Sequence, residues 1–417
     1  MIKALAGMSP QIKQYLIITG NYWAFTLTDG ALRMLVVLYF HQLGYSPINI
    51  AMLFVFYEVF GVITNLIGGW LGARLGLNKT MNIGLAMQIV ALMMLTVPAD
   101  MLTVVYVMIA QALSGIAKDL NKMSAKSAIK LLVPKSNNGS ATNNNSSDSD
   151  NNSSDSDNKL YHWVAVLTGS KNALKGVGFF LGGVLLTALG FKHAILLMAA
   201  MLLIVWIWSL ISLKAELGKA KNKPKFTEIF SKSRSINLLS AARLFLFGAR
   251  DVWFVVALPV FLATTFNWDH WWVGGFMASW VIGYGMVQSI APRFTGNVPE
   301  PQAAARWAGY LAVIPVLIAI ALHYQFYVQF SIVFGLLVFG GLFAINSSLH
   351  SYLIVSLADS DGVSMDVGFY YMANAMGRLI GTLLSGWVFQ VYGLEMCLWI
   401  SAVFIAISAV IALKLED

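Results

Sequence analysis

Charged side chains stand inside stretches that are otherwise apolar enough for a lipid bilayer. Asp29 and Arg33 lie four residues apart, so a helix would place them on one face, where they can pair. Lys171 and Lys175 have the same spacing. Two like charges held close together in a medium of low polarity repel each other, and this arrangement makes most sense around an anion. The spacing therefore predicts a site for negatively charged groups.

A second group of basic residues strengthens this interpretation. Arg243 and Arg250 are seven residues apart and share a helical face, and Arg250 precedes Asp251. Arg33 and Arg250 fall in comparable helices of two sequence halves, so we expect their guanidinium groups to face each other and clamp an oxyanion in bidentate fashion. The predicted substrate-binding residues are Arg33, Lys171, Lys175, Arg243, Arg250 and Arg378. The alternative is that these charges form structural ion pairs that lock helices together.

Acidic residues in the same stretches are fewer than basic ones, and they are expected to act as ion-pair or coupling groups. We expect Asp29 to hold Arg33 in place when the site is empty, and Asp251 to pair with Arg250. Glu58 has no compensating charge nearby in the sequence. It could carry a proton during antiport, or it could be protonated and inert; the sequence leaves both open. The basic surplus favours a multivalent anionic substrate.

The elements that must position these residues are long apolar stretches. The chain has 417 residues, 58% hydrophobic and 11% charged, with a mean hydropathy of +0.71, whereas soluble proteins have roughly 25% charged residues. About twelve stretches reach the roughly 20 residues that a membrane span needs. They lie near 14–40, 48–71, 80–98, 102–122, 161–189, 193–213, 237–263, 271–290, 306–323, 327–357, 366–390 and 394–414. Because backbone groups in lipid must be satisfied within each span, we predict an all-α integral membrane protein.

Lys and Arg residues indicate the orientation of the chain. If the N-terminus is cytoplasmic, the loops on that side carry most of the basic residues, including the cluster from Lys214 to Arg234. Both termini then face the cytoplasm. The net charge of +8 follows from this asymmetry, and contact with the lipid bilayer explains it better than binding of nucleic acid.

The chain divides into two halves of six spans. Residues 1–213 form the N-terminal half, the basic segment 214–236 is a cytoplasmic linker, and residues 237–417 form the C-terminal half. Weak internal repetition favours the major facilitator fold, in which two six-helix halves are parallel repeats. Residues 136–158 are rich in Asn, Ser and Asp, and we expect them to be a disordered cytoplasmic loop that serves as a spacer.

Several functional classes are disfavoured by what the sequence lacks. With one cysteine, Cys397, the chain cannot form an internal disulfide or a thiolate metal cluster. It contains no nucleotide-binding Walker sequence and no hydrolase or metalloprotease motif. We therefore predict no catalytic residues, no metal and no cofactor, and neither an enzyme nor a sensor.

The segment GGWLGARLGLNKT at 68–80 resembles the loop that major facilitator proteins carry between spans two and three. Gly69, Arg74 and Gly76 match that loop, whereas its acidic position is Ala73 here and its first basic position is Leu77. The glycines would let helices two and eleven approach closely, and charges would latch one conformation. We expect the loss of the acidic residue to weaken or reroute the latch.

Longer runs resemble one family in particular, the ArsJ organoarsenical permeases. They include GNYWAFTLTDGALRMLVVLYFHQLGYSP, GIAKDLNKMSAKSAIKLLVP, TGSKNALKGVGFFLGG and MGRLIGTLLSGW. The likeness covers nearly the whole chain except the loop 136–158. It implies a bacterial inner-membrane exporter of 1-arseno-3-phosphoglycerate that confers arsenate resistance, with a dedicated glyceraldehyde-3-phosphate dehydrogenase as the functional partner that makes the ester.

The residues agree with this implication in two respects. A phosphate and an arsenate group need guanidinium and ammonium donors, which are present, whereas trivalent arsenic would need several thiolates. We expect a monomer that works as a secondary active exporter, driven by an ion gradient or by the substrate gradient itself. Proton antiport would use Glu58 and Asp29. The alternative is an exporter or exchanger of another organophosphate or organic anion.

Overall fold

The computed structural model describes a chain made of helices. The described residues are 10–45, 53–132, 148–213, 217–220, 225, 227, 230, 233–268, 270–296 and 299–415. No strand occurs among them. The prediction of an all-helical protein is confirmed for this part of the chain.

The N-terminal half consists of long helices that fill the predicted spans. They are α2 (Pro10–Gln42), α4 (Val55–Leu75), α5 (Leu77–Met94), α6 (Val104–Leu132) and α7 (Asp148–Ser212), with a short 3-10 helix at Ala99–Met101. Gly190, with φ of 71°, interrupts α7, because a positive φ suits glycine and ends the regular helix. This break separates the two spans predicted at 161–189 and 193–213.

The C-terminal half has the same kind of organisation. It contains α8 (Arg234–Phe254), α9 (Ala257–Thr265), α10 (His270–Ser289), α11 (Pro292–Thr295), α12 (Ala303–His323), α13 (Val328–Leu357) and α14 (Val363–Ala412). Ser233 caps α8 by accepting a hydrogen bond from the Ile236 N–H. Gly393, with φ of 78°, breaks α14 as Gly190 breaks α7.

Six stretches of the described helices are long and apolar enough to cross a membrane by themselves. They are Pro10–Phe40, Leu160–Ser212, Arg234–Thr265, Ala303–His323, Val328–Leu357 and Val363–Ala412. Two of them contain the glycine breaks and cover two predicted spans each. Helices α4, α5, α6 and α10 lie at the other predicted positions, so the chain is a multi-pass membrane protein.

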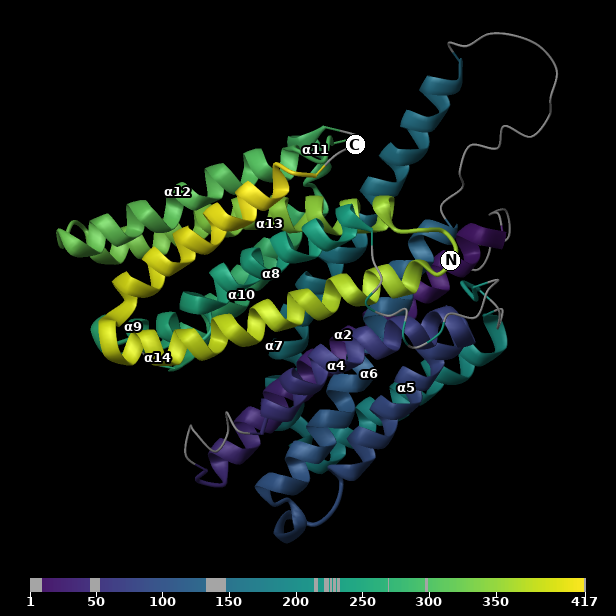
Figure 1. Cartoon of the computed structure of the whole chain (residues 1–417). Coiled ribbons are helices and arrows are strands. Elements are labelled where there is room, and N and C mark those ends of the chain that lie inside the picture. Colours follow the sequence, from purple (N-terminus) through teal and green to yellow (C-terminus); the bar gives the residue numbers. More distant parts are fainter. Residues whose placement is uncertain are drawn as a thin grey trace.

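The two halves meet at one end and separate at the other. Figure 1 shows both termini at the end where the halves converge, with the α9 end of the C-terminal half pointing away from the N-terminal half. One hydrophobic core joins residues of both halves, such as Ile18 and Leu353. The second core contains only residues of the C-terminal half, such as Trp253 and Phe339. The halves therefore diverge toward the side away from the termini, which we call the open side (Figure 1).

Glycines allow α4 and α14 to approach each other at the closed end. A Cβ atom on Gly69 would lie 2.5 Å from the Ser364 carbonyl oxygen, and one on Gly368 would lie 2.8 Å from the Gly69 Cα. The Ser364 hydroxyl donates a hydrogen bond of 2.8 Å to the Gly69 carbonyl. Backbone contact of this kind requires residues without side chains and fixes the two halves against each other.

The loop predicted to be disordered is described only in part. Residues 136–147 lie outside the described part of the chain, whereas residues 148–158 belong to the first turns of α7. Composition alone predicts an irregular segment, whereas α7 extends into its second part.

Candidate functional site

A chain of ion pairs crosses from one half of the protein to the other. Glu58 Oε1 lies 3.3 Å from Arg33 Nη2 and 3.6 Å from Arg378 Nη2. Arg378 Nε lies 3.1 Å from Asp251 Oδ2, and Asp251 Oδ1 lies 2.5 Å from Arg250 Nη2. We call Arg33, Glu58, Arg250, Asp251 and Arg378 the central network. It connects α2 and α4 of the N-terminal half with α8 and α14 of the C-terminal half.

The partner of Arg33 is not the one that helical spacing predicts. Asp29 accepts hydrogen bonds of 2.8 and 3.0 Å from the Tyr57 hydroxyl instead. Arg33 stacks on the same Tyr57 ring, with 4.6 Å between its Cζ and the ring centroid, and pairs with Glu58. The expected Asp29–Arg33 pair is therefore wrong, because α4 presents both a hydroxyl and a carboxylate to this face of α2.

Glu58 is also not the uncompensated acid that its sequence surroundings indicate. Its carboxylate pairs with Arg33 and Arg378, which come from different halves of the chain. Arg378 in turn lies between Arg33 and Arg250 in the chain of ion pairs, so these two guanidinium groups do not face each other directly. Three guanidinium groups share two carboxylates, and the network keeps a positive excess.

Further basic side chains surround the network. Lys171 and Lys175 of α7 are partly exposed, and their charges are repelled by those of Arg33 and Arg378, among others. Lys171 Nζ donates a hydrogen bond of 3.3 Å to Asn172 Oδ1. The structure thus brings both predicted lysines to the same region as Arg33 and Arg378.

Helix α6 adds charged residues that the sequence interpretation missed. Lys118, Asp119, Lys122 and Lys126 all lie within this helix, and Asp119 pairs with Lys122 Nζ at 2.7 Å. The predicted span ended at residue 122, which left Lys126 in a cytoplasmic loop. The spacing of Lys118, Lys122 and Lys126 by four residues was the signal that a single charged helix face continues through this segment.

Arg243 lies apart from the open space. It is 3% exposed and stacks on Phe247. Its Nε donates a hydrogen bond of 2.9 Å to Asn374 Oδ1, and its Nη1 donates one of 3.2 Å to the Ser347 carbonyl. These contacts join α8, α13 and α14, so Nε and Nη1 of Arg243 already have partners within the C-terminal half.

Three side chains of the central network can be reached by solvent. The side chains of Arg33, Glu58 and Arg378 are 25%, 32% and 31% exposed, whereas Asp251 is fully buried. Toward the termini the halves are closed, since the Tyr161 hydroxyl lies 2.9 Å from the Thr295 hydroxyl. The guanidinium groups of Arg33 and Arg378 are therefore accessible to solvent.

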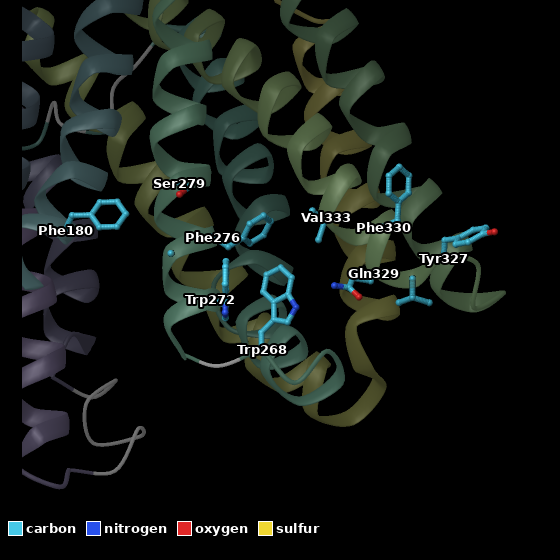
Figure 2. Close-up of a pocket in the computed structure, with 11 residues that line it drawn as sticks. Phe180, Trp268, Trp272, Phe276, Ser279, Tyr327, Gln329, Phe330 and Val333 are labelled. Atoms are coloured by element: carbon cyan, nitrogen blue, oxygen red, sulfur yellow. The ribbon is translucent and has the colours of Figure 1, made fainter.

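A separate hollow lies at the outer edge of the two halves. Its volume is about 1160 Å³, and its walls are mostly aromatic, including Trp268, Trp272, Phe276 and Phe330. Figure 2 shows Phe180 of the N-terminal half facing this hollow across from the C-terminal half. Such apolar walls suit lipid tails rather than an anion, so the candidate site is the central network.

The predicted conformational loop contacts the linker between the halves. Gly76 has φ of 97° and separates α4 from α5, and the Arg74 guanidinium lies over the Trp70 ring at 5.1 Å. The Leu77 N–H donates a hydrogen bond of 2.7 Å to the Leu217 carbonyl, and the Ala220 N–H donates one of 2.8 Å to the Ala73 carbonyl. Backbone hydrogen bonds to the linker thus occupy the two positions, Ala73 and Leu77, that depart from the usual charged pattern of the loop.

The described residues contain no cluster of three or more His, Cys, Asp or Glu side chains that could hold a metal ion. The charges that are brought together are instead guanidinium and ammonium groups with a smaller number of carboxylates. This donor set suits oxyanions such as phosphate or carboxylate groups.

Comparisons with known proteins agree on the architecture. Residues 18–147 match the sequence profile of the Major Facilitator Superfamily. A bacterial homologue of the iron transporter ferroportin in an outward-facing state has a TM-score of 0.73 at 13% identity, covering 96% of this chain and 98% of that chain. No curated protein sequence matches the chain.

Two further solved structures have the same arrangement of helices. The human organic anion transporter MFSD10 (TETRAN) has a TM-score of 0.73 at 15% identity, with 97% of this chain and 100% of that chain covered. The proton:xylose symporter XylE bound to 6-bromo-6-deoxy-D-glucose has a TM-score of 0.71 at 11% identity, with 96% and 95% covered. At these identities the likeness concerns the fold.

Proposed function

We propose that this chain, which has the major facilitator fold of two six-helix halves, is a secondary transporter that exports a multivalent organic oxyanion. The central network carries the proposal. It lies between the halves, it is partly open to solvent, and it holds guanidinium groups whose positive charge exceeds that of their carboxylate partners. In a fold that works by rocking of its halves, the site between them is where a substrate binds.

The proposed mechanism is a competition for Arg33 and Arg378. In the empty site the Glu58 carboxylate pairs with both guanidinium groups and offsets part of their charge. An incoming phosphate-like group offers more acceptor oxygens and more charge than one carboxylate, so it takes the place of Glu58 on these two residues. Since Arg33 and Arg378 belong to different halves, the bound oxyanion draws the halves together and favours closure of the open side.

The renewed pairing of Glu58 with the two arginines explains how the site releases its substrate. When the halves have rocked and the substrate leaves, Glu58 pairs again with the arginines, and the network is not left with unpaired charges in a region of low polarity. Asp251 is fully buried and remains bound to Arg250 and Arg378 throughout this exchange. We propose Asp251 as the residue that orients Arg378, and Asp29 as the residue that orients Tyr57 beneath Arg33.

The resemblance to the organoarsenical permeases supplies the substrate: 1-arseno-3-phosphoglycerate, made by the partner glyceraldehyde-3-phosphate dehydrogenase. The ester carries two oxyanion groups, and the basic donors of the network and of α6 and α7 suit them. The single cysteine is buried in the C-terminal half, so it offers no thiolate cluster for trivalent arsenic. The alternative cargo is another organophosphate or organic anion, since the same donors would bind it.

The proposed orientation has both termini in the cytoplasm of a bacterium, with the chain in the inner membrane as a monomer. The side away from the termini then faces outward, and the structure is in an outward-open state. The charge distribution of the loops and the likeness to an outward-facing structure support this orientation.

Arsenate tolerance of a sensitive bacterium tests the function. The chain is expressed with and without the partner dehydrogenase, as wild type, as Arg33→Ala, and as Arg306→Ala, a matched control whose arginine is 63% exposed and pairs with Glu300. We expect tolerance and external arsenate only when both proteins are present, loss with Arg33→Ala, and no change with Arg306→Ala at equal membrane abundance. Tolerance that does not need the dehydrogenase, or none at all, would move the proposal to another anionic cargo.

A further inference from the structure

We propose that Lys126, together with Lys122 and Lys171, forms a second oxyanion-binding subsite on the closed side of the central network. The inference rests on the proposed function and deepens it: the substrate would have two oxyanion groups, one bound by Arg33 and Arg378 and the other by these lysines. The ligand class is a small organic bisphosphate or an ester of the same charge pattern.

Lys126 is the exception in a row of lysines on α6. Three members of the row have partners in the structure. Lys118 lies 3.8 Å from the centre of the Tyr57 ring, Lys122 pairs with Asp119, and Lys130 donates to the Ser356 and Ala358 carbonyls. Lys126 is 2% exposed, and its Nζ has no hydrogen-bond partner among the described residues.

The charges that act on Lys126 are all positive. They belong to Lys171, Arg243 and Lys122. The acid nearest in the sequence, Asp119, uses Oδ1 to bind Lys122. A buried amine surrounded by like charges either keeps its charge at a large cost in free energy or gives up its proton, and a bound anion would remove that cost. The arrangement is therefore explained if an anion from outside the chain is the missing partner.

The position of Lys126 sets the direction of the bound substrate. Lys122 lies one helical turn nearer the central network and stacks on the Tyr371 ring at 4.6 Å. Lys130 lies one turn nearer the closed end, where it binds the end of α13 in the other half. Lys126 thus lies in the contact between the halves, below the network and above the closed end. A substrate with two oxyanions would bridge the two levels and reach Lys126 once the halves rearrange.

Binding of two probes to the purified full chain in lipid nanodiscs tests this subsite. The probes are 2,3-bisphosphoglycerate, with two phosphates, and glycerol 3-phosphate, with one, and calorimetry gives the Kd of each. We expect wild type to bind the bisphosphate at least tenfold more tightly. Lys126→Gln should lower that preference to less than threefold and leave the Kd of glycerol 3-phosphate within twofold. Lys130→Gln, the matched control, should keep the preference.

Thermal unfolding gives a second readout that does not depend on the probes. Because an unpaired buried ammonium destabilises the empty protein, Lys126→Met should raise Tm in the absence of ligand and remove the extra Tm increase that the bisphosphate causes in wild type. Lys130→Met should lower Tm, since it deletes hydrogen bonds to carbonyls.

The outcomes separate the subsite from the function. If wild type prefers the bisphosphate and Lys126→Gln keeps that preference, the subsite is overturned while the proposed function stands. The same holds if Lys126→Met lowers Tm as Lys130→Met does. If wild type binds neither probe and transports no phosphate ester, the proposed function fails, and the subsite fails with it.

Discussion

The Glu58 carboxylate of α4 lies 3.6 Å from the Arg378 guanidinium of α14, and this ion pair joins the two halves of the protein. The same oxygen atom, Oε1, lies 3.3 Å from Arg33 Nη2. One carboxylate oxygen thus holds two guanidinium groups from opposite halves in the positions from which they would bind an oxyanion. In the proposed mechanism Glu58 acts as an internal substitute for the substrate, and this relationship leads to the first prediction.

Glu58→Gln removes the competing charge and keeps the size of the side chain. We expect the Kd for a phosphate ester to fall about tenfold, since hydrogen bonds to charged groups are worth about 1.5–3 kcal/mol and the substrate no longer displaces one. Transport should slow, because no carboxylate helps the substrate to leave. Calorimetry and vesicle flux measure the two effects. The matched control is Glu300→Gln, an exposed acid that pairs with Arg306. Weaker binding by Glu58→Gln would contradict the competition.

Arg378→Lys keeps the charge and removes the fork of donors. Arg378 uses Nε for Asp251 and Nη2 for Glu58, and a single ammonium cannot make both contacts in the same geometry. We expect affinity for a phosphate ester to fall about tenfold, or about 1.4 kcal/mol, with unchanged membrane abundance. Binding equal to that of wild type would mean that charge alone is sufficient at this position.

Arg243→Met should affect stability more than binding. Its guanidinium donates to Asn374 and to the Ser347 carbonyl from a buried position, and loss of a hydrogen bond to a charged group costs about 1.5–3 kcal/mol. We expect a clear decrease in Tm of the detergent-purified protein and a Kd for phosphate ester close to that of wild type. A normal Tm combined with lost binding would show instead that Arg243 contacts the substrate, as the sequence predicts.

Gly69→Ala should loosen the closed end. The added methyl group would lie 2.5 Å from the Ser364 carbonyl oxygen, so α4 and α14 must move apart. In a Cys397→Ser background, a cysteine in place of Thr295, which contacts Tyr161 across the closed end, should react faster with a maleimide applied from the side of the termini. Gly20→Ala is the control, because nothing lies within 4 Å of its added Cβ. Equal labelling rates in both variants would argue against the glycine contact as a closing element.

Gly218→Val tests the docking of the linker on the loop between α4 and α5. Gly218 has φ of +73°, and a Cβ there would lie 2.5 Å from Leu77 Cγ, so valine would displace the neighbouring hydrogen bonds of Leu217 and Ala220. We expect the same faster labelling at position 295 as for Gly69→Ala. Unchanged labelling would mean that the linker contributes nothing to closure.

The positions of the charges could be read from the sequence, but their partners could not. A charged residue in an apolar run is visible because its type contrasts with its neighbours, and Arg33, Glu58, Arg250 and Arg378 were found in this way. Partners depend on how each helix is rotated and on what its neighbours present. The spacing rule favours Asp29 for Arg33, whereas α4 offers Tyr57 to one and Glu58 to the other.

The lysines of α6 were missed for a different physical reason. Lys residues after an apolar run usually mark the membrane boundary, so the predicted span stopped near Lys122. The helix continues to Leu132, and packing against both halves buries Lys126. The number and type of the helices followed from apolar length and from the need of each span to satisfy its own backbone groups. The separation of the halves on one side did not, since it reflects a balance between conformations of one fold.

Export by the purified chain in liposomes tests the central claim most directly. The liposomes enclose glyceraldehyde-3-phosphate dehydrogenase, its substrate, NAD and radiolabelled arsenate, and the arsenate that appears outside is measured for wild type and Arg378→Ala. The account predicts release of arsenate that requires both the enclosed dehydrogenase and the wild-type chain. With Arg378→Ala the release should fall to the level of liposomes that lack the transporter. Release at the wild-type rate by Arg378→Ala, or release that does not depend on the dehydrogenase, would contradict it.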